Sequence, residues 1–238
     1  MAENLLILVF RRERLLKNRN LKGFRGFTLA EVLITLVIIG VIAAMTIPTL
    51  MNKTNNQELV SRAKKTYSTL AQATQKIIAE EGNPRADIGG WATDNTAIYN
   101  LYKKHLSKAV DCNPGQSCFS VSHVGMDGTG AGTDNYNMTS SNRGKLILAD
   151  GAIVNFHYYH NNCSPGQLSD ETSVCAYIHV DVNGAKGPNV WGRDAFRYYI
   201  SENGFGASGC DYDSTNCPNV KGGQACSCVV LRENAMNY

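Results

Sequence analysis

The chain has 238 residues, with 23 Lys and Arg against 20 Asp and Glu, a formal net charge of +3, and 8 cysteines. The basic excess lies at the start: residues 1–26 carry seven basic residues against Glu3 and Glu13, a net of +5, so the remainder would carry −2. The overall charge therefore gives no argument for nucleic-acid binding. Without residues 1–26, the length suits a long helix and one modest globular domain.

The first predicted element is an apolar helix. Residues 32–51 contain no charged side chain, and a helix of this length spans about 30 Å, the thickness of the hydrocarbon core of a bilayer. The short basic segment before it should stay in the cytoplasm, which directs the rest of the chain outward. Glu31 stands at the start of this run, and an ionised carboxylate there needs a cation as a partner.

The residues around Glu31 resemble the class III signal of type IV pilins and type II secretion pseudopilins, which here reads Arg25-Gly26-Phe27-Thr28-Leu29-Ala30-Glu31. The resemblance implies that a prepilin peptidase cuts after Gly26 and that the new terminal residue, Phe27, is N-methylated. The new α-amino group would lie one helical turn before Glu31. It would neutralise that carboxylate within one chain or between neighbouring subunits.

The cleavage site has to be chosen between two Gly–Phe pairs, Gly23–Phe24 and Gly26–Phe27. The family pattern requires a glutamate as the fifth residue of the mature chain, and only the second pair provides it, as Glu31. The alternative is an ordinary signal anchor in which Glu31 has no special role.

A second, amphipathic helical segment continues the first. No proline or glycine interrupts residues 52–81, and apolar or small side chains recur at steps of three and four, at Val60, Ala63, Tyr67, Leu70, Ala71, Thr74, Ile77 and Ile78. Gly82 suits a helix end and Pro84 cannot continue the helix. A helix from Thr28 to Glu81 would measure roughly 80 Å. Within it, Gly40 and Pro48 are weak points, and in related filaments the corresponding stretch melts when subunits pack.

The remainder of the chain predicts a small sheet with short helices. The expected elements are a helix at 93–108 capped by Asp94, a loop region at 111–143, a hairpin of strands 145–149 and 152–158 about Asp150-Gly151, strands at 175–182 and 195–200, and a terminal helix at 224–236. Short connections imply an antiparallel meander covered by the amphipathic helix. This is the α+β pilin-like fold: a long amino-terminal membrane-spanning helix packed on an antiparallel head with disulfides.

All eight cysteines follow the apolar segment, which fits an oxidising compartment and disulfides; they are Cys112, Cys118, Cys163, Cys175, Cys210, Cys217, Cys226 and Cys228. The local pairs favoured are Cys112 with Cys118 and Cys163 with Cys175. Cys226 and Cys228 are too close to bond each other, so each should reach back to Cys210 or Cys217. Structural zinc is the rival interpretation, but the paired C-x-x-C spacing is missing.

A glycine-rich stretch offers four hard oxygen ligands of the type that Ca²⁺ prefers, on Asp181, Asn183, Asn189 and Asp194. It is loosely similar to the calcium loop in the head of some pseudopilins but lacks EF-hand spacing. The alternative, which we favour, is a strand-joining loop whose Asp and Asn residues form turns. Trp191, within the stretch, is expected in the core.

No catalytic motif is present, so no enzymatic activity is expected. His157 and His179 are expected to be hydrogen-bonded sheet residues rather than ligands. The resemblance implies a leader at 1–26, a transmembrane half-helix at 27–51, an amphipathic half at 52–82 and a head at 83–238.

The expected function is that of a structural subunit of a type IV pilus or a type II secretion pseudopilus. The alternatives are a minor tip subunit whose head binds a surface, a sugar or a secreted substrate, and, well below both, an exported enzyme. The expected partners are prepilin peptidase, itself and other pilin-like subunits, the inner-membrane assembly platform and the lipid bilayer. The expected location is the inner membrane with a periplasmic head, and then an extracellular pilus or a periplasmic pseudopilus.

Overall fold

The computed structural model describes residues 26–116, 121–128, 130, 140 and 142–238. The chain divides into two compact units, Met1–Leu50 and Met51–Tyr238. The second is called the globular unit here. One long helix, α2 (Leu29–Glu81), contributes its first part to one unit and its second part to the other. The prediction of a continuous helix that ends at Glu81 is thus confirmed.

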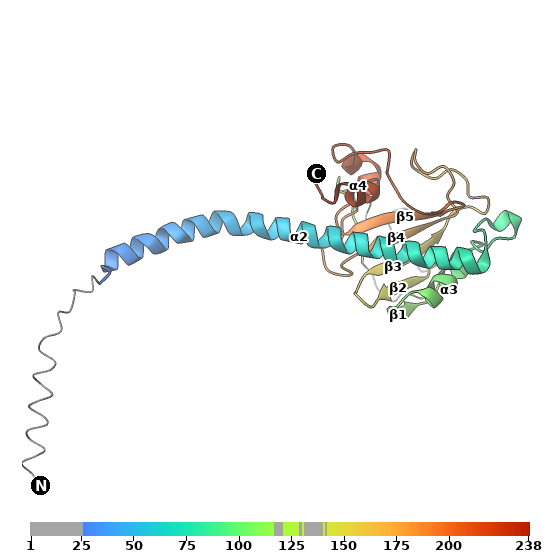
Figure 1. Ribbon diagram of the computed structural model, residues 1–238, viewed down its shortest axis with the longest axis horizontal. Helices are drawn as coiled ribbons and strands as arrows, with labels where there is room; N and C mark the ends of the chain where they lie inside the picture. Colours follow the sequence, from blue (N-terminus) through green and yellow to red (C-terminus); the bar gives the residue numbers. More distant parts are fainter. Residues whose placement is uncertain (1–25, 117–120, 129, 131–139, 141) are drawn as a thin grey trace, which may run out of the picture. The chain divides into compact units, whose positions relative to one another are not determined.

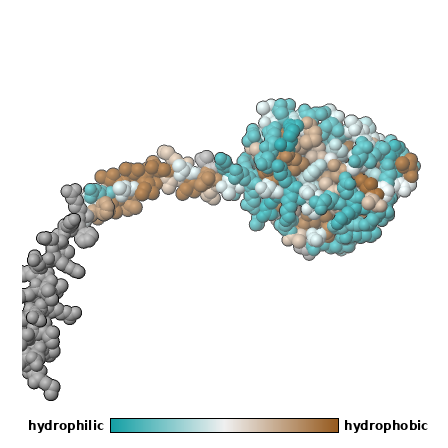
Figure 2. Space-filling view, in the orientation of Figure 1, coloured by the Kyte–Doolittle hydropathy of each residue, from teal (hydrophilic) through white to brown (hydrophobic). Residues whose placement is uncertain are grey.

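The first part of α2 is apolar and uncovered. An 18-residue window of it has a mean hydropathy of 2.5, and no residue in that window is buried. Its length and composition are sufficient to cross a membrane. Figure 2 shows hydrophobic side chains along this part of the helix. Gly40 and Pro48 both lie within α2, and a Cβ added at Gly40 would have no heavy atom within 4 Å.

The second part of α2 buries one face in the globular unit. Its buried side chains recur at steps of three and four residues and include Val60, Ala63, Leu70, Ala73, Thr74 and Ile77. The amphipathic spacing predicts this face because residues three and four apart lie on one side of a helix. The helix ends before Gly82, whose φ of 83° is the left-handed conformation common at helix ends.

Six strands form one antiparallel sheet in the order β1-β2-β3-β4-β5-β6. They are β1 (Lys108–Cys112), β2 (Lys145–Leu148), β3 (Ile153–Tyr158), β4 (Ala176–Asp181), β5 (Ala195–Ser201) and β6 (Gly204–Ala207). The predicted hairpin and the next two strands correspond to β2 to β5. The edge strands β1 and β6 were not predicted.

One face of the sheet packs on α2. Figure 1 shows α2 crossing the strands, and residues of β2 to β6 share one hydrophobic core with the buried face of the helix. Tyr198 on β5 makes an edge contact with Tyr67 on α2, with ring centroids 5.3 Å apart. Its hydroxyl donates to the Ala63 carbonyl oxygen at 3.4 Å. This layer of helix on antiparallel sheet is the α+β pilin-like architecture.

The opposite face of the sheet buries polar groups around Arg197. The Arg197 guanidinium is 1% exposed and donates to Glu171 Oε1 at 2.8 Å and to Gln224 Oε1 at 2.7 Å. It also lies 4.9 Å from the centroid of the Tyr177 ring. A buried charge is tolerated only when it is paired and hydrogen-bonded. Arg197 therefore ties β5 to the segment before β4 and to the carboxyl-terminal segment.

Two short α-helices, α3 (Asn95–His105) and α4 (Cys226–Glu233), and three 3-10 helices, η1 (Ala86–Ile88), η2 (Cys217–Asn219) and η3 (Lys221–Gly223), complete the described elements. In α3, the Asp94 carboxylate accepts hydrogen bonds from the backbone N–H groups of Thr96 and Ala97, as predicted for its N-cap. The helix ends three residues before the predicted Lys108, because Lys108 already belongs to β1. The terminal helix is α4, within the predicted range.

Three disulfides are present among the described residues: Cys163–Cys175, Cys210–Cys228 and Cys217–Cys226. The first is the predicted local pair. The other two connect α4 backward, as expected for two cysteines too close to bond each other. Cys118 lies outside the described residues, so its pairing with Cys112 stays a prediction.

Candidate functional site

The candidate site of processing lies just before α2. Gly26 and Phe27 have no regular structure, and the Phe27 side chain is 86% exposed. A peptidase requires access to the bond that it cuts, and this segment is exposed and lies outside any helix or strand.

Thr28 and Glu31 form a reciprocal cap at the start of α2. The Glu31 carboxylate oxygen Oε2 accepts hydrogen bonds from the Thr28 backbone N–H and from the Thr28 hydroxyl, each at 2.9 Å. In return, the Glu31 backbone N–H donates to the Thr28 hydroxyl oxygen at 3.2 Å. This is a capping box, which satisfies helix N–H groups that have no partner within the helix.

The cap directs the Glu31 carboxylate toward the amino-terminal end of the helix. It reaches the N–H of Thr28, the residue directly after Phe27. A terminal amine on Phe27 would thus lie one residue before the Thr28 N–H, which already donates to this carboxylate. The sequence contains the signal for this cap, because Thr-x-x-Glu before an apolar run is the capping-box pattern, although the prediction from sequence gave Glu31 only an ion-pair role.

In the loop proposed to bind calcium, the Asp carboxylates accept hydrogen bonds from groups of the protein itself. The two oxygens of Asp194 accept the backbone N–H groups of Asn189 at 2.8 Å and Val190 at 2.7 Å. Asp181 Oδ2 lies 2.7 Å from His123 Nε2, and Asp181 Oδ1 accepts the Asn183 N–H at 3.1 Å. Calcium requires six to eight oxygen ligands, whereas these carboxylate oxygens are held by protein donors. The residues do not fit a calcium ion in this conformation, and the loop alternative accounts for their geometry.

The sheet also holds two histidines, His179 on β4, which is buried, and His157 on β3, which is half-buried. The prediction that His157 and His179 are hydrogen-bonded is wrong for one atom of each, because both Nδ1 atoms are buried without a hydrogen-bond partner among the described residues. Burial, and then the nearby Arg143 and Arg197 guanidinium groups, lower the pKa of His157 to about 3 and that of His179 well below its usual value. Trp191 is fully buried, as expected.

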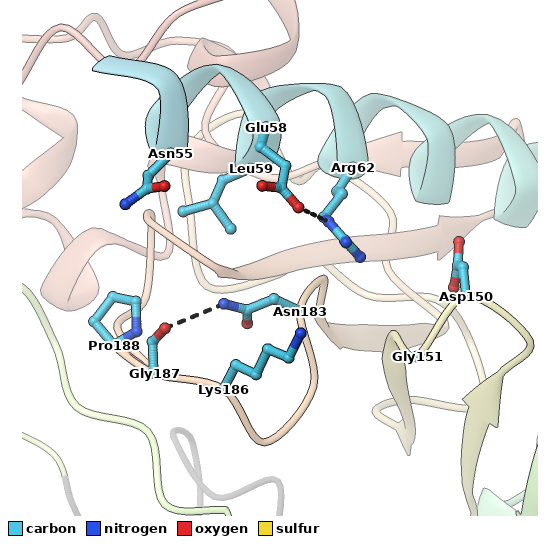
Figure 3. Close-up of a pocket in the computed structure, with 10 residues that line it drawn as sticks. All are labelled: Asn55, Glu58, Leu59, Arg62, Asp150, Gly151, Asn183, Lys186, Gly187 and Pro188. Atoms are coloured by element: carbon cyan, nitrogen blue, oxygen red, sulfur yellow. Dashed lines mark hydrogen bonds and ion pairs between the residues drawn. The ribbon is translucent and has the colours of Figure 1, made fainter. Parts of the chain in front are cut away.

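A pocket of about 370 Å³ opens in the globular unit beside α2. Asn55, Glu58, Leu59 and Arg62 of α2 form one wall, and the loops that hold Asp150, Gly151, Asn183, Lys186, Gly187 and Pro188 form the other. Figure 3 shows the Arg62 and Lys186 side chains directed into the same space from opposite walls. The Asn183 amide donates to the Gly187 carbonyl oxygen at 3.2 Å, which braces the loop.

Residues 21–47 match the family described as the prokaryotic N-terminal methylation motif. The chain carries the signature of type IV pilins and pseudopilins. No curated protein and no solved structure matches it. Pilin-type chains are in general structural proteins and substrates of prepilin peptidase. The match covers the segment that holds Gly26, Phe27, Glu31 and Gly40.

The remaining predicted assembly residues of this pilin-like chain lie along its first helix. The structure brings neither Gly40 nor Pro48 together with the cap, because both are part of the exposed helical stretch, further along α2. Both are helical in this structure. Their role in helix melting on assembly stays a prediction.

Proposed function

We propose that this chain is a structural subunit of a type IV pilus or a type II secretion pseudopilus. Prepilin peptidase removes residues 1–26 by cutting after Gly26, and the new terminal Phe27 is methylated. Residues 27–51 cross the inner membrane and later form the filament core. Residues 52–82 connect this stretch to the head, residues 83–238, in the periplasm.

One observation carries the proposal: the described apolar side chains in the first part of α2 are exposed. Large side chains there are between 42% and 78% exposed, from Val32 at the low end to Leu29 at the high end. Burial of apolar surface contributes about 25 cal/mol per Å², so this stretch requires lipid or other helices around it. A lipid bilayer covers this apolar surface before assembly, and the same helix of neighbouring subunits covers it afterward.

Glu31 gives the helix packing its register. Within an apolar surrounding the carboxylate needs a cation, and the processed Phe27 amine provides one beside the Thr28 cap. The inner-membrane assembly platform would act on subunits in this processed state. Packing of equivalent helices with heterologous contacts extends without closing, which is the symmetry of a filament.

A minor tip subunit is the second candidate, and the pocket beside α2 is the observation that favours it. Shearing the surface fibres from the native cell and quantifying their proteins separates the two. As a structural subunit, this chain should be a bulk component. A trace amount would favour the tip subunit, and absence from all fibres and from the periplasmic pseudopilus would contradict both.

The choice of cleavage site is tested by two matched variants. Gly26→Val should leave an uncut precursor in the inner membrane, whereas Gly23→Val, at the other Gly–Phe pair, should be cut normally. Electrophoresis of membrane fractions resolves the two forms. Normal cutting of Gly26→Val, or loss of cutting in Gly23→Val alone, would contradict the chosen site.

A further inference from the structure

A lysine is buried in the sheet of the globular unit. Lys145 is the first residue of β2, and its side chain is 0% exposed. Full burial is rare for lysine, because its ammonium group loses its hydration. Burial, and then the nearby Arg143 guanidinium, lower the pKa of Lys145 from its usual value. Both effects favour the neutral amine, which is the nucleophilic form of lysine.

The side chain opposite Lys145 on the next strand is a carboxamide. Lys145 pairs with Asn155 of β3 in the antiparallel register, and Asn155 is also fully buried. The Phe156 N–H donates to the Gly144 carbonyl oxygen at 3.1 Å. Hydrogen-bonded and non-hydrogen-bonded pairs alternate along an antiparallel ladder, so the pair formed by Lys145 and Asn155 is of the non-hydrogen-bonded kind, in which side chains lie closest.

This pairing places the amine within reach of the carboxamide. The Cβ atoms of directly opposite residues lie about 4.5–5.5 Å apart on the same face of a sheet. The lysine amine is carried on a flexible four-carbon stem, so it can fold onto the carboxamide carbon of Asn155. Groups held together in this way react as if present at very high concentration. Strands β2 and β3, which lie side by side (Figure 1), supply that placement.

An imidazole continues the same row of side chains. His179 of β4 is the register partner of Asn155 on its other side, so the amine, the carboxamide and the imidazole follow one another across three strands. His179 is buried, and its Nδ1 has no hydrogen-bond partner among the described residues. Burial lowers its pKa well below the usual value, so the imidazole is neutral and can accept a proton and pass it on.

We propose that Lys145 and Asn155 form an intramolecular isopeptide bond that joins β2 to β3. The lone pair of Lys145 Nζ attacks Asn155 Cγ, and the bond from Cγ to Nδ2 breaks. The His179 imidazole carries one proton from Nζ to Nδ2, which leaves as ammonia. The products are a secondary amide and one molecule of ammonia, so the reaction requires no cofactor, oxidant or second chain.

The bond would close the β2–β3 hairpin covalently. Unlike the disulfides of the globular unit, an amide is not cleaved by a reductant. This inference goes beyond the proposed function and does not depend on it, because the reacting groups belong to one chain. A filament subunit and a tip subunit would both carry the cross-link.

Peptide mapping of the full chain, purified in detergent from the native cell and reduced, tests the bond. Cleavage before aspartate residues separates Lys145, in peptide 134–149, from Asn155, in peptide 150–169. Mass spectrometry should find the two peptides joined, with a mass equal to their sum less one water and one ammonia when written as one cut chain, that is, their separate masses less one ammonia. Two separate peptides of unaltered mass would overturn the bond.

The joined peptide is required as the readout because the mass of the whole chain is ambiguous. A succinimide at Asn183-Gly184 or at Asn203-Gly204 would also release one ammonia. It would leave peptides 134–149 and 150–169 separate. A whole-chain mass lower by one ammonia with these two peptides separate would therefore also overturn the proposal.

Two matched lysine variants identify the amine. Lys145→Met removes the amine and keeps an unbranched side chain, whereas Lys108→Met changes an exposed lysine on the edge strand β1. The peptides should be separate in Lys145→Met and joined in Lys108→Met. Joined peptides in Lys145→Met, or separate peptides in Lys108→Met, would overturn the assignment of the amine to Lys145.

The role of the imidazole has its own variant. In His179→Gln, the folded protein should contain separate peptides alongside joined ones, because the proton is no longer carried from Nζ to Nδ2. Complete joining in this variant would overturn the role of His179 and leave the bond itself established. Separate peptides in the unaltered chain contradict only this cross-link, whereas an unprocessed amino terminus contradicts only the proposed function.

Discussion

At the start of α2, the carboxylate of Glu31 already has a structural task in the unprocessed chain. It accepts two hydrogen bonds from Thr28, so it caps the helix whether or not a free amine exists nearby. The proposed ion pair with the Phe27 amine adds a second task, which depends on the negative charge. The cap needs only an acceptor, and glutamine serves as well as glutamate at this position of a capping box.

Two substitutions of Glu31 separate these tasks. Glu31→Gln keeps an acceptor for the cap but removes the charge, and Glu31→Ala removes both. Both variants should be cut normally but should assemble poorly, because the amine loses its counter-charge. The measurement is the ratio of filament protein to processed membrane protein. Filament yield from Glu31→Gln equal to that of the unaltered chain would assign the requirement to the cap alone.

His157 and His179 should make the globular unit sensitive to acid. Their pKa values are lowered in the folded chain, while unfolding restores values near 6.5, so below pH 6.5 the unfolded chain binds more protons. The free energy of unfolding should therefore fall as the pH drops, by about 2 kcal/mol for each imidazole between pH 6.5 and 5.

Denaturant titrations of the full chain in detergent at several pH values measure this dependence. His157→Asn should weaken it, whereas His160→Asn, at an exposed histidine, should leave it unchanged. A free energy of unfolding that stays constant from pH 7 to 5 would show that these histidines are not buried in their neutral form.

At the level of elements, α2 joins an uncovered apolar stretch to an amphipathic stretch that completes the core. The sequence was sufficient for both parts because each has a clear pattern: residues 32–51 have no charge, and the buried positions recur at steps of three and four. The β2–β3 hairpin was equally predictable, since two β-rich runs flank Asp150-Gly151.

Other elements were not predictable from local pattern. Gly204–Ala207 contains two glycines, which are poor strand formers, and becomes β6 because it pairs with β5 beyond a short turn. Lys108–Cys112 continues directly from a predicted helix and becomes β1 by pairing with β2. The contact of Asp181 with His123 was also hidden, because His123 comes from a distant part of the chain.

Leu70 tests the packing of α2 on the sheet. It is fully buried, so Leu70→Ala should lower the free energy of unfolding by about 2–5 kcal/mol through lost burial and a residual cavity. Lys76→Ala, at an exposed position on the same helix, should change it by less than about 0.5 kcal/mol. Equal effects from the two variants in denaturant titrations would contradict the buried face assigned to the helix.

For the whole molecule, the disulfides of the globular unit bear on the compartment proposed for it. The disulfides Cys210–Cys228 and Cys217–Cys226 staple the carboxyl-terminal segment, whose Gln224 and Ser227 side chains bind Arg197 on the sheet. Disulfides persist in oxidising surroundings, which agrees with export of the globular unit. The redox state of the cysteines is thus an independent check on the proposed topology.

Removing one of these disulfides should lower the free energy of unfolding by a defined amount. Cys210→Ser combined with Cys228→Ser opens a loop with a sequence separation of 18, and the chain-entropy estimate for such a loop is about 3 kcal/mol of stability. Denaturant titrations of the oxidised protein measure the loss. A protein of unchanged stability would indicate that this bridge contributes nothing to the fold, and free thiols in the protein from native cells would contradict export to an oxidising compartment.

The central claim is that cleavage exposes an α-amino group on Phe27, which neutralises the carboxylate of Glu31 and prepares the helix for assembly. Mass spectrometry of the amino-terminal peptide from filaments or membranes of the native cell tests it most directly. The account predicts a mature chain that begins with N-methylated Phe27 and lacks residues 1–26. An uncut chain, or a terminus at any other residue, would contradict it.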